Sequence, residues 1–146
     1  MFNYYFDAEK EGHDDVVRLF EAIRAGAYEG YASTLVTDEL KRAPEPKRGN
    51  MLDLVDRYSI HILKPSSIVM DLAKLYINNG IIPSSHLLDS AHIAMASVSK
   101  LDCVVSYNFH HINRSKTRNL TSVVNQDNGY SVVFICSAKE VLDNEG

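Results

Sequence analysis

The chain has 146 residues, of which 45% are hydrophobic and 23% charged, and its formal net charge is −4. This size and composition predict a single soluble globular domain over residues 1–146. The acidic balance excludes the overall basic character of many duplex-DNA binders. No stretch approaches the roughly 18 consecutive apolar residues of a membrane span, and the start of the chain lacks a signal-peptide pattern, so a cytoplasmic location is expected.

Helix-like stretches alternate with short strand-like runs along the chain. Thr37 is a candidate N-cap for the helix expected around residues 36–42, and the two prolines within residues 43–49 exclude a continuous helix there. Residues 123–124 are expected to form at most a short strand. Apolar residues at helical spacing predict helices, and apolar β-branched runs predict strands. The expected helices cover residues 14–25, 36–42, 51–58, 67–79, 84–100 and 138–142, and the expected strands cover 31–35, 60–63, 103–106 and 130–136.

Strands separated by helices of this length are typical of βαβ crossovers. We therefore expect an α/β fold whose central sheet is mainly parallel and covered by helices on both faces. Such domains usually open with a strand, whereas this chain opens with FNYYFD and then a helix. The first strand is therefore expected to be missing or replaced.

Three polar side chains are expected near the carboxyl ends of the strands, where ligands bind in open α/β sheets. Asp89 lies in the first turns of the helix over 84–100, and Asn108 lies just past the strand over 103–106. Glu39 follows another strand and is expected on the first turn of the next helix. Carboxylates and amide oxygens bind Mg²⁺ or Mn²⁺, so Glu39, Asp89 and Asn108 are the candidate metal and catalytic residues.

Each acid also has a simpler interpretation. Glu39 taken alone is more typical of a helix N-terminal acid that the helix dipole favours than of a metal ligand. Asp89 is an acid within the apolar run HLLDSAHIAMA, so it is either an exposed first-turn residue or a functional one. Asp102 precedes its strand, which places it at the wrong end of a parallel sheet.

The histidines and cysteines give weaker signals. A zinc site of His86, Asp89 and His92 is not expected, because positions i and i+6 do not share a helix face; His92 is expected to be a hydrogen-bonded residue beside Asp89. His110 and His111 are expected in a solvated loop, with contact to phosphate or proton transfer as the alternative. Cys103 and Cys136 are expected to be buried free thiols.

Basic residues form two clusters that flank the candidate metal ligands in sequence. Each cluster either contacts RNA or is an ordinary solvated part of the surface. Lys and Arg contacts to phosphate dominate affinity for nucleic acids. The candidate RNA-binding residues are Lys41 and Arg42 in the first cluster, with Lys47 and Arg48 beside them, and Arg114 and Lys116 in the second, with Arg118 beside them.

The chain resembles the PIN-domain nucleases, including the toxin subunits of VapBC-type toxin–antitoxin pairs. The order and spacing of the matching pieces together carry the resemblance. It implies a three-layer α/β/α domain and a ribonuclease that cleaves RNA phosphodiester bonds at an acidic Mg²⁺ or Mn²⁺ site. The pieces are FNYYFD (2–7), TLVTDEL (34–40), LLDSAHIAMA (87–96), VVSYNFHHIN (104–113) and NQDNGYSVVFICSAKEVL (125–142).

Within this resemblance, Glu39 and Asp89 match two of the family's acids, and Asn108 stands where many members carry Asp. The family's first acid falls upstream of Met1. Asp7 could substitute for this acid, but we rather expect Asp7 to cap the helix that follows it. The alternative is therefore a catalytically degenerate PIN-like binding or assembly module.

The resemblance also implies an RNA substrate, a homodimer and a small antitoxin as partners. Another hydrolase-type enzyme has no positive support, since the chain contains no G-x-S-x-G, P-loop or G-x-G-x-x-G motif.

Overall fold

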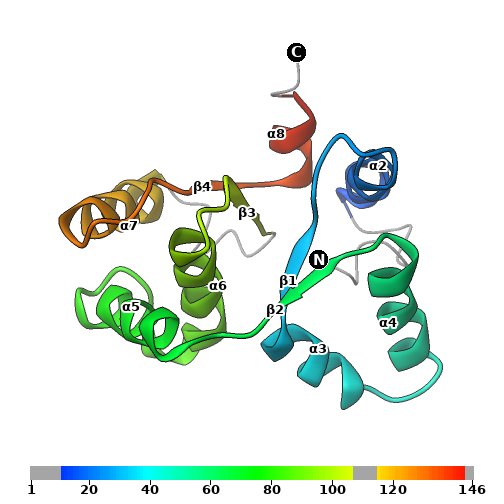
Figure 1. Ribbon diagram of the computed structural model, residues 1–146, viewed down its shortest axis with the longest axis horizontal. Helices are drawn as coiled ribbons and strands as arrows, with labels where there is room; N and C mark the ends of the chain where they lie inside the picture. Colours follow the sequence, from blue (N-terminus) through cyan, green and yellow to red (C-terminus); the bar gives the residue numbers. More distant parts are fainter. Residues whose placement is uncertain (1–10, 107–114, 144–146) are drawn as a thin grey trace. The chain divides into compact units, whose positions relative to one another are not determined.

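The computed structural model describes residues 11–106 and 115–143. The chain divides into two compact units, the first comprising Met1–Lys64 with Ala138–Gly146 and the second comprising Pro65–Ser137. Helices alternate with short strands that pair in parallel, so the predicted mixed α/β class is confirmed (Figure 1). Each unit contains one two-stranded sheet.

The first unit is built around a parallel strand pair. Strands β1 and β2 pair in the register Tyr31↔His61, and helix α8 returns to pack on α2. The Tyr28 hydroxyl donates to the Val141 carbonyl at 3.2 Å and so ties this last helix to the unit. The elements are α2 (His13–Arg24), β1 (Tyr31–Ser33), α3 (Thr34–Lys41), α4 (Lys47–Arg57), β2 (His61–Leu63) and α8 (Ala138–Asp143).

Helix α3 begins earlier than predicted. The predicted cap at Thr37 is wrong: the Ser33 side chain accepts from the Val36 amide at 3.4 Å and caps the helix, while the Thr37 hydroxyl donates back to the Thr34 carbonyl. Both Ser and Thr satisfy orphan amides at helix starts, so sequence alone did not separate them. The expected strand over 31–35 is therefore cut to three residues.

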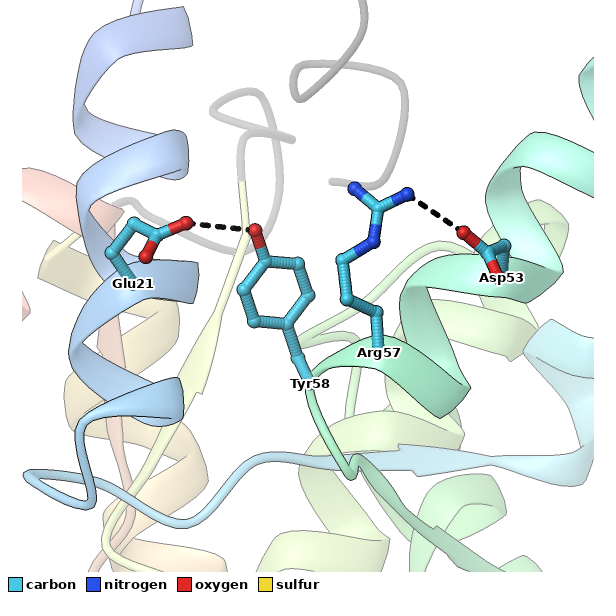
Figure 2. A network of polar contacts seen from close by, with 4 residues as sticks. All are labelled: Glu21, Asp53, Arg57 and Tyr58. Atoms are coloured by element: carbon cyan, nitrogen blue, oxygen red, sulfur yellow. Dashed lines mark hydrogen bonds and ion pairs between the residues drawn. The ribbon is translucent and has the colours of Figure 1, made fainter.

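A mixed apolar and polar contact joins α2 to the end of α4 (Figure 2). The buried ring of Tyr58 packs on Phe20 with centroids 5.1 Å apart, and its hydroxyl donates to Glu21 at 2.9 Å. Beside it, Arg57 forms an ion pair with Asp53 one turn earlier at 2.7 Å. The Tyr58 contact satisfies the buried hydroxyl while the ring supplies apolar burial, which is how tyrosine is usually accommodated in a core.

The second unit has its core between two helices, α5 and α6. Small residues on the facing sides, Ala73, Ala91 and Ala94, are fully buried and allow close packing. Strands β3 and β4 pair in parallel with the register Val104↔Ile135. The elements are α5 (Ser67–Asn78), the 3₁₀ turn η1 (Ser84–His86), α6 (Leu87–Val98), β3 (Cys103–Val105), α7 (Ser115–Asp127) and β4 (Phe134–Cys136).

A buried polar network links α5, α6 and α7. The Tyr76 hydroxyl donates to the Asn125 amide oxygen and lies 3.2 Å from the Ser97 hydroxyl. The Asn125 amide group donates to Ser97 at 2.8 Å and to the Ser131 carbonyl at 3.0 Å. Burial raises the pKa of Tyr76 to about 12, so the hydroxyl stays protonated and can donate.

Some predicted boundaries are wrong in this unit. Residues 123–124 lie inside α7 and form no strand, because the Asn125 contact and buried Thr117 and Thr121 hold the segment helical against the core. The last strand covers only Phe134–Cys136, and the helix expected over 84–100 begins with the turn η1. Tertiary contacts thus override β-branched propensity at these short runs.

The end of α6 carries a strained lysine. Lys100 has φ 58°, and the Leu101 amide closes the helix end on the Ala96 carbonyl at 2.9 Å. Helix α5 ends with the same closure, but there Gly80 takes the left-handed position at φ 72°. Left-handed backbone costs a residue with a Cβ about 1 kcal/mol or more.

Replacing Lys100 by glycine is therefore expected to stabilise the chain by about 1 kcal/mol, since glycine takes this conformation without the Cβ clash. Urea unfolding monitored by circular dichroism measures the change. Ser99→Gly is the matched control, because Ser99 has φ −84° and gains nothing from glycine. A stability unchanged or lowered by Lys100→Gly would contradict the assignment of strain.

Candidate functional site

Asp89 lies in the first turn of α6, as predicted. The helix is fixed on its buried side, where the Ser90 hydroxyl donates to the Ala73 carbonyl of α5 at 2.7 Å and Ala91 is fully buried. Asp89 falls beside this buried face, with 22% of its side chain exposed. A carboxylate in this position is partly desolvated yet still within reach of a ligand from solvent.

His86 is the side chain that the structure places next to Asp89. It ends the turn η1 and occupies the N-cap of α6, and its Nδ1 lies 3.4 Å from the Asp89 Oδ2. The sequence analysis expected His92 beside Asp89 and did not predict this contact of His86. The spacing i, i+3 was the available signal, because residues three apart face each other across one helical turn.

Glu39 is exposed on α3, the sixth residue of a helix that begins at Thr34. Its predicted place on the first turn is wrong, because the helix is capped by Ser33, four residues before the predicted cap at Thr37. The helix dipole disfavours acids near a C-terminal end, so the dipole does not explain Glu39. No other described residue forms an ion pair with it.

The first basic cluster lies at the end of the same helix. Lys41 and Arg42 are exposed, and Lys47 is exposed at the start of α4. Arg48 is neutralised by Glu45 at 2.7 Å. The structure therefore leaves three of these four cations exposed on the segment that carries Glu39.

Several candidate residues lie outside the described residues. Asn108 and Arg114 fall within 107–114, as do His110 and His111, and Asp7 falls within 1–10. Lys116 is exposed at the start of α7.

The strand β3 ends at Val105, three residues before Asn108 in the sequence. Its pairing with β4 continues to Ser106, whose amide donates to the Cys136 carbonyl at 2.9 Å. Asp102 is exposed and precedes β3, which confirms its place at the amino end of that strand.

Both cysteines of the β3–β4 pair are free thiols, Cys136 buried and Cys103 half-buried. Burial raises the pKa of Cys103 to about 11, with smaller contributions from Cys136 and Asp102. A thiol with a raised pKa is a poor nucleophile at neutral pH. The prediction of free thiols is confirmed for both cysteines, and the predicted burial is confirmed for Cys136 but not for Cys103.

The proposed ligands belong to different parts of the chain, Glu39 to the first unit and Asp89 to the second. Carboxylate oxygens and the amide oxygen of Asn108 form the donor set that Mg²⁺ and Mn²⁺ accept, so the chemistry of these residues fits such ions. Across residues 11–106 and 115–143, no three His, Cys, Asp or Glu side chains gather closely enough to hold a metal ion.

Among the described helices, none combines the length and apolar character needed to cross a membrane. Comparison with family models, curated proteins and solved structures finds no significant match to this chain.

Proposed function

We propose that this chain is a metal-dependent ribonuclease of the PIN type, with Glu39, Asp89 and Asn108 as its metal-binding and catalytic residues. The observation that carries the proposal is Asp89, a partly desolvated, accessible carboxylate beside His86 at the start of α6. The exposed Glu39, which the helix dipole does not favour, is the second support.

We also propose that the two strand pairs belong to one mainly parallel sheet in a three-layer α/β/α PIN-like domain. Parallel sheets are normally covered on both faces, and two strands alone are rarely stable. Yet Tyr31 and Ile62 on the first pair are 39% and 40% exposed, and Phe134 on the second is 66% exposed. These exposed side chains support a larger, more completely covered sheet.

A bound Mg²⁺ or Mn²⁺ would activate water and stabilise charge on the phosphodiester. The carboxylates of Glu39 and Asp89 would hold the cation, and the Asn108 amide oxygen would add a neutral donor. The exposed Lys41 and Arg42, with Arg114 and Lys116, orient the RNA by contacts to phosphate. From the resemblance we further propose a homodimer and an antitoxin that blocks the site.

The proposal is tested by incubating the purified chain with a panel of single-stranded and structured RNAs in Mn²⁺, Mg²⁺ or EDTA. We expect cleavage that requires metal and falls at least about tenfold in Glu39→Gln, because one charged ligand is lost. Asp38→Asn is the matched control, since Asp38 is an exposed acid one residue earlier on the same helix.

Equal losses in Glu39→Gln and Asp38→Asn would contradict the role of Glu39. An intact chain that binds RNA but cleaves none of the panel in either metal would overturn the nuclease proposal and favour the degenerate binding module.

A further inference from the structure

The pair His86–Asp89 differs chemically from other ion pairs in the described structure. Asp15, Glu45 and Asp53 each face an arginine, at 3.6, 2.7 and 2.7 Å. An arginine guanidinium has no lone pair for a metal and keeps its charge, so it competes with a cation for the carboxylate. An imidazole nitrogen, in contrast, is itself a metal ligand.

The separation of the two donors suits a shared ion. The His86 Nδ1 and Asp89 Oδ2 atoms lie 3.4 Å apart. With metal–ligand distances of about 2.1–2.2 Å, this separation subtends an angle of roughly 100–110° at the ion. That angle lies close to tetrahedral and within the range of a distorted octahedron, so the separation of the two atoms matches that of two ligands of one ion.

The local fold holds both donors in place while leaving them accessible. His86 is fixed between the turn η1 and the start of α6, and Asp89 lies one turn later on the same helix. Their side chains are 33% and 22% exposed. Neither residue lies deep in the core, so an ion can reach them and remaining positions can be filled by water or substrate.

We propose that His86 and Asp89 form a two-donor chelate that selects a first-row transition ion such as Mn²⁺ over Mg²⁺. Mg²⁺ requires oxygen ligands and dehydrates reluctantly, whereas transition ions accept an imidazole nitrogen. This inference rests on the proposed function in taking Asp89 as a metal ligand, and it narrows the choice of cation there.

Isothermal titration of the full chain with MnCl₂ and with MgCl₂ tests the chelate. We expect Mn²⁺ to bind at least tenfold more tightly than Mg²⁺. In His86→Gln, Mn²⁺ affinity is expected to fall about 10–100-fold while Mg²⁺ affinity changes by less than about twofold. Asp89→Asn weakens binding of both ions, and His61→Gln, an exposed histidine on β2, changes neither.

Titration with Co²⁺ gives a second readout, since loss of a nitrogen donor in His86→Gln shifts the visible absorption of the bound ion. Circular dichroism of each variant checks that the fold is retained, and His86→Asn repeats the test with a shorter side chain. An unchanged Mn²⁺/Mg²⁺ ratio in both variants, or no Mn²⁺ binding by the intact chain, overturns the chelate.

The chelate and the nuclease proposal fail separately. Metal-dependent RNA cleavage that requires Asp89 but is indifferent to His86 leaves the function standing and removes the chelate. Mn²⁺ binding that requires both residues, in a chain that cuts no RNA, leaves the chelate standing and removes the function.

Discussion

Asp89→Asn is expected to lower metal-dependent RNA cleavage by at least about 100-fold, equivalent to about 2.7 kcal/mol in the activation barrier. The substitution keeps the size of the side chain and removes its charge. Since Asp89 is one of only two carboxylates in the proposed ligand set, the remaining charge attracts a divalent cation far less strongly. Cleavage rates at saturating RNA and at several Mn²⁺ concentrations measure the loss.

Asp71 provides a matched control for Asp89→Asn. Asp71 is an exposed acid on α5 of the same unit, so Asp71→Asn makes the same chemical change at a surface position. We expect Asp71→Asn to retain the rate of the unaltered chain within about twofold, because surface substitutions away from a site usually have small effects. Retained cleavage by Asp89→Asn would contradict the assignment of Asp89 as a ligand.

Asn125→Ala is expected to destabilise the second unit by about 2–4 kcal/mol. The Asn125 side chain is 1% exposed and bonds to Tyr76, Ser97 and the Ser131 carbonyl. Alanine leaves these buried partners with lost hydrogen bonds, and an unsatisfied buried polar group costs about 1–3 kcal/mol before the loss of packing is added. Denaturant unfolding followed by circular dichroism measures the change.

Asn128→Ala is the matched control, since Asn128 lies exposed at the end of the same helix. Its amide group donates to the Val124 carbonyl at 2.8 Å on the exposed surface. We expect a change within about 0.5 kcal/mol for this variant. Equal effects of the two alanine variants would show that the Tyr76–Ser97–Asn125 network does not stabilise the unit.

The helices were the part of the fold that sequence reasoning predicted best. Apolar spacing located α2, α5 and α6, and Gly80 ends α5 as expected, because each of these features acts within one or two turns. Strands were predicted too long, and residues 123–124 were misassigned, because three-residue parallel strands are set by pairing with distant segments rather than by local propensity.

The candidate site was also predictable only where local sequence determines the structure. The first-turn position of Asp89 follows from the start of an apolar helix, and it is confirmed. The position of Glu39 depended on whether Ser33 or Thr37 caps α3, a choice between chemically equivalent residues. The spacing i, i+3 was a signal for the proximity of His86 to Asp89, but the turn η1 that places His86 at the N-cap of α6 was not predicted.

The central claim is that Glu39 and Asp89 hold the same cation, and paramagnetic broadening by Mn²⁺ tests it most directly. Amide resonances close to a bound Mn²⁺ disappear from the nuclear magnetic resonance spectrum. Substoichiometric Mn²⁺ is predicted to broaden the amides of Glu39 and Asp89 together. Asp89→Asn is predicted to restore both amides, and Glu39→Gln is predicted to restore the amide at position 39. Broadening confined to one of the two acids, or spread equally to exposed acids such as Asp71, would contradict the claim.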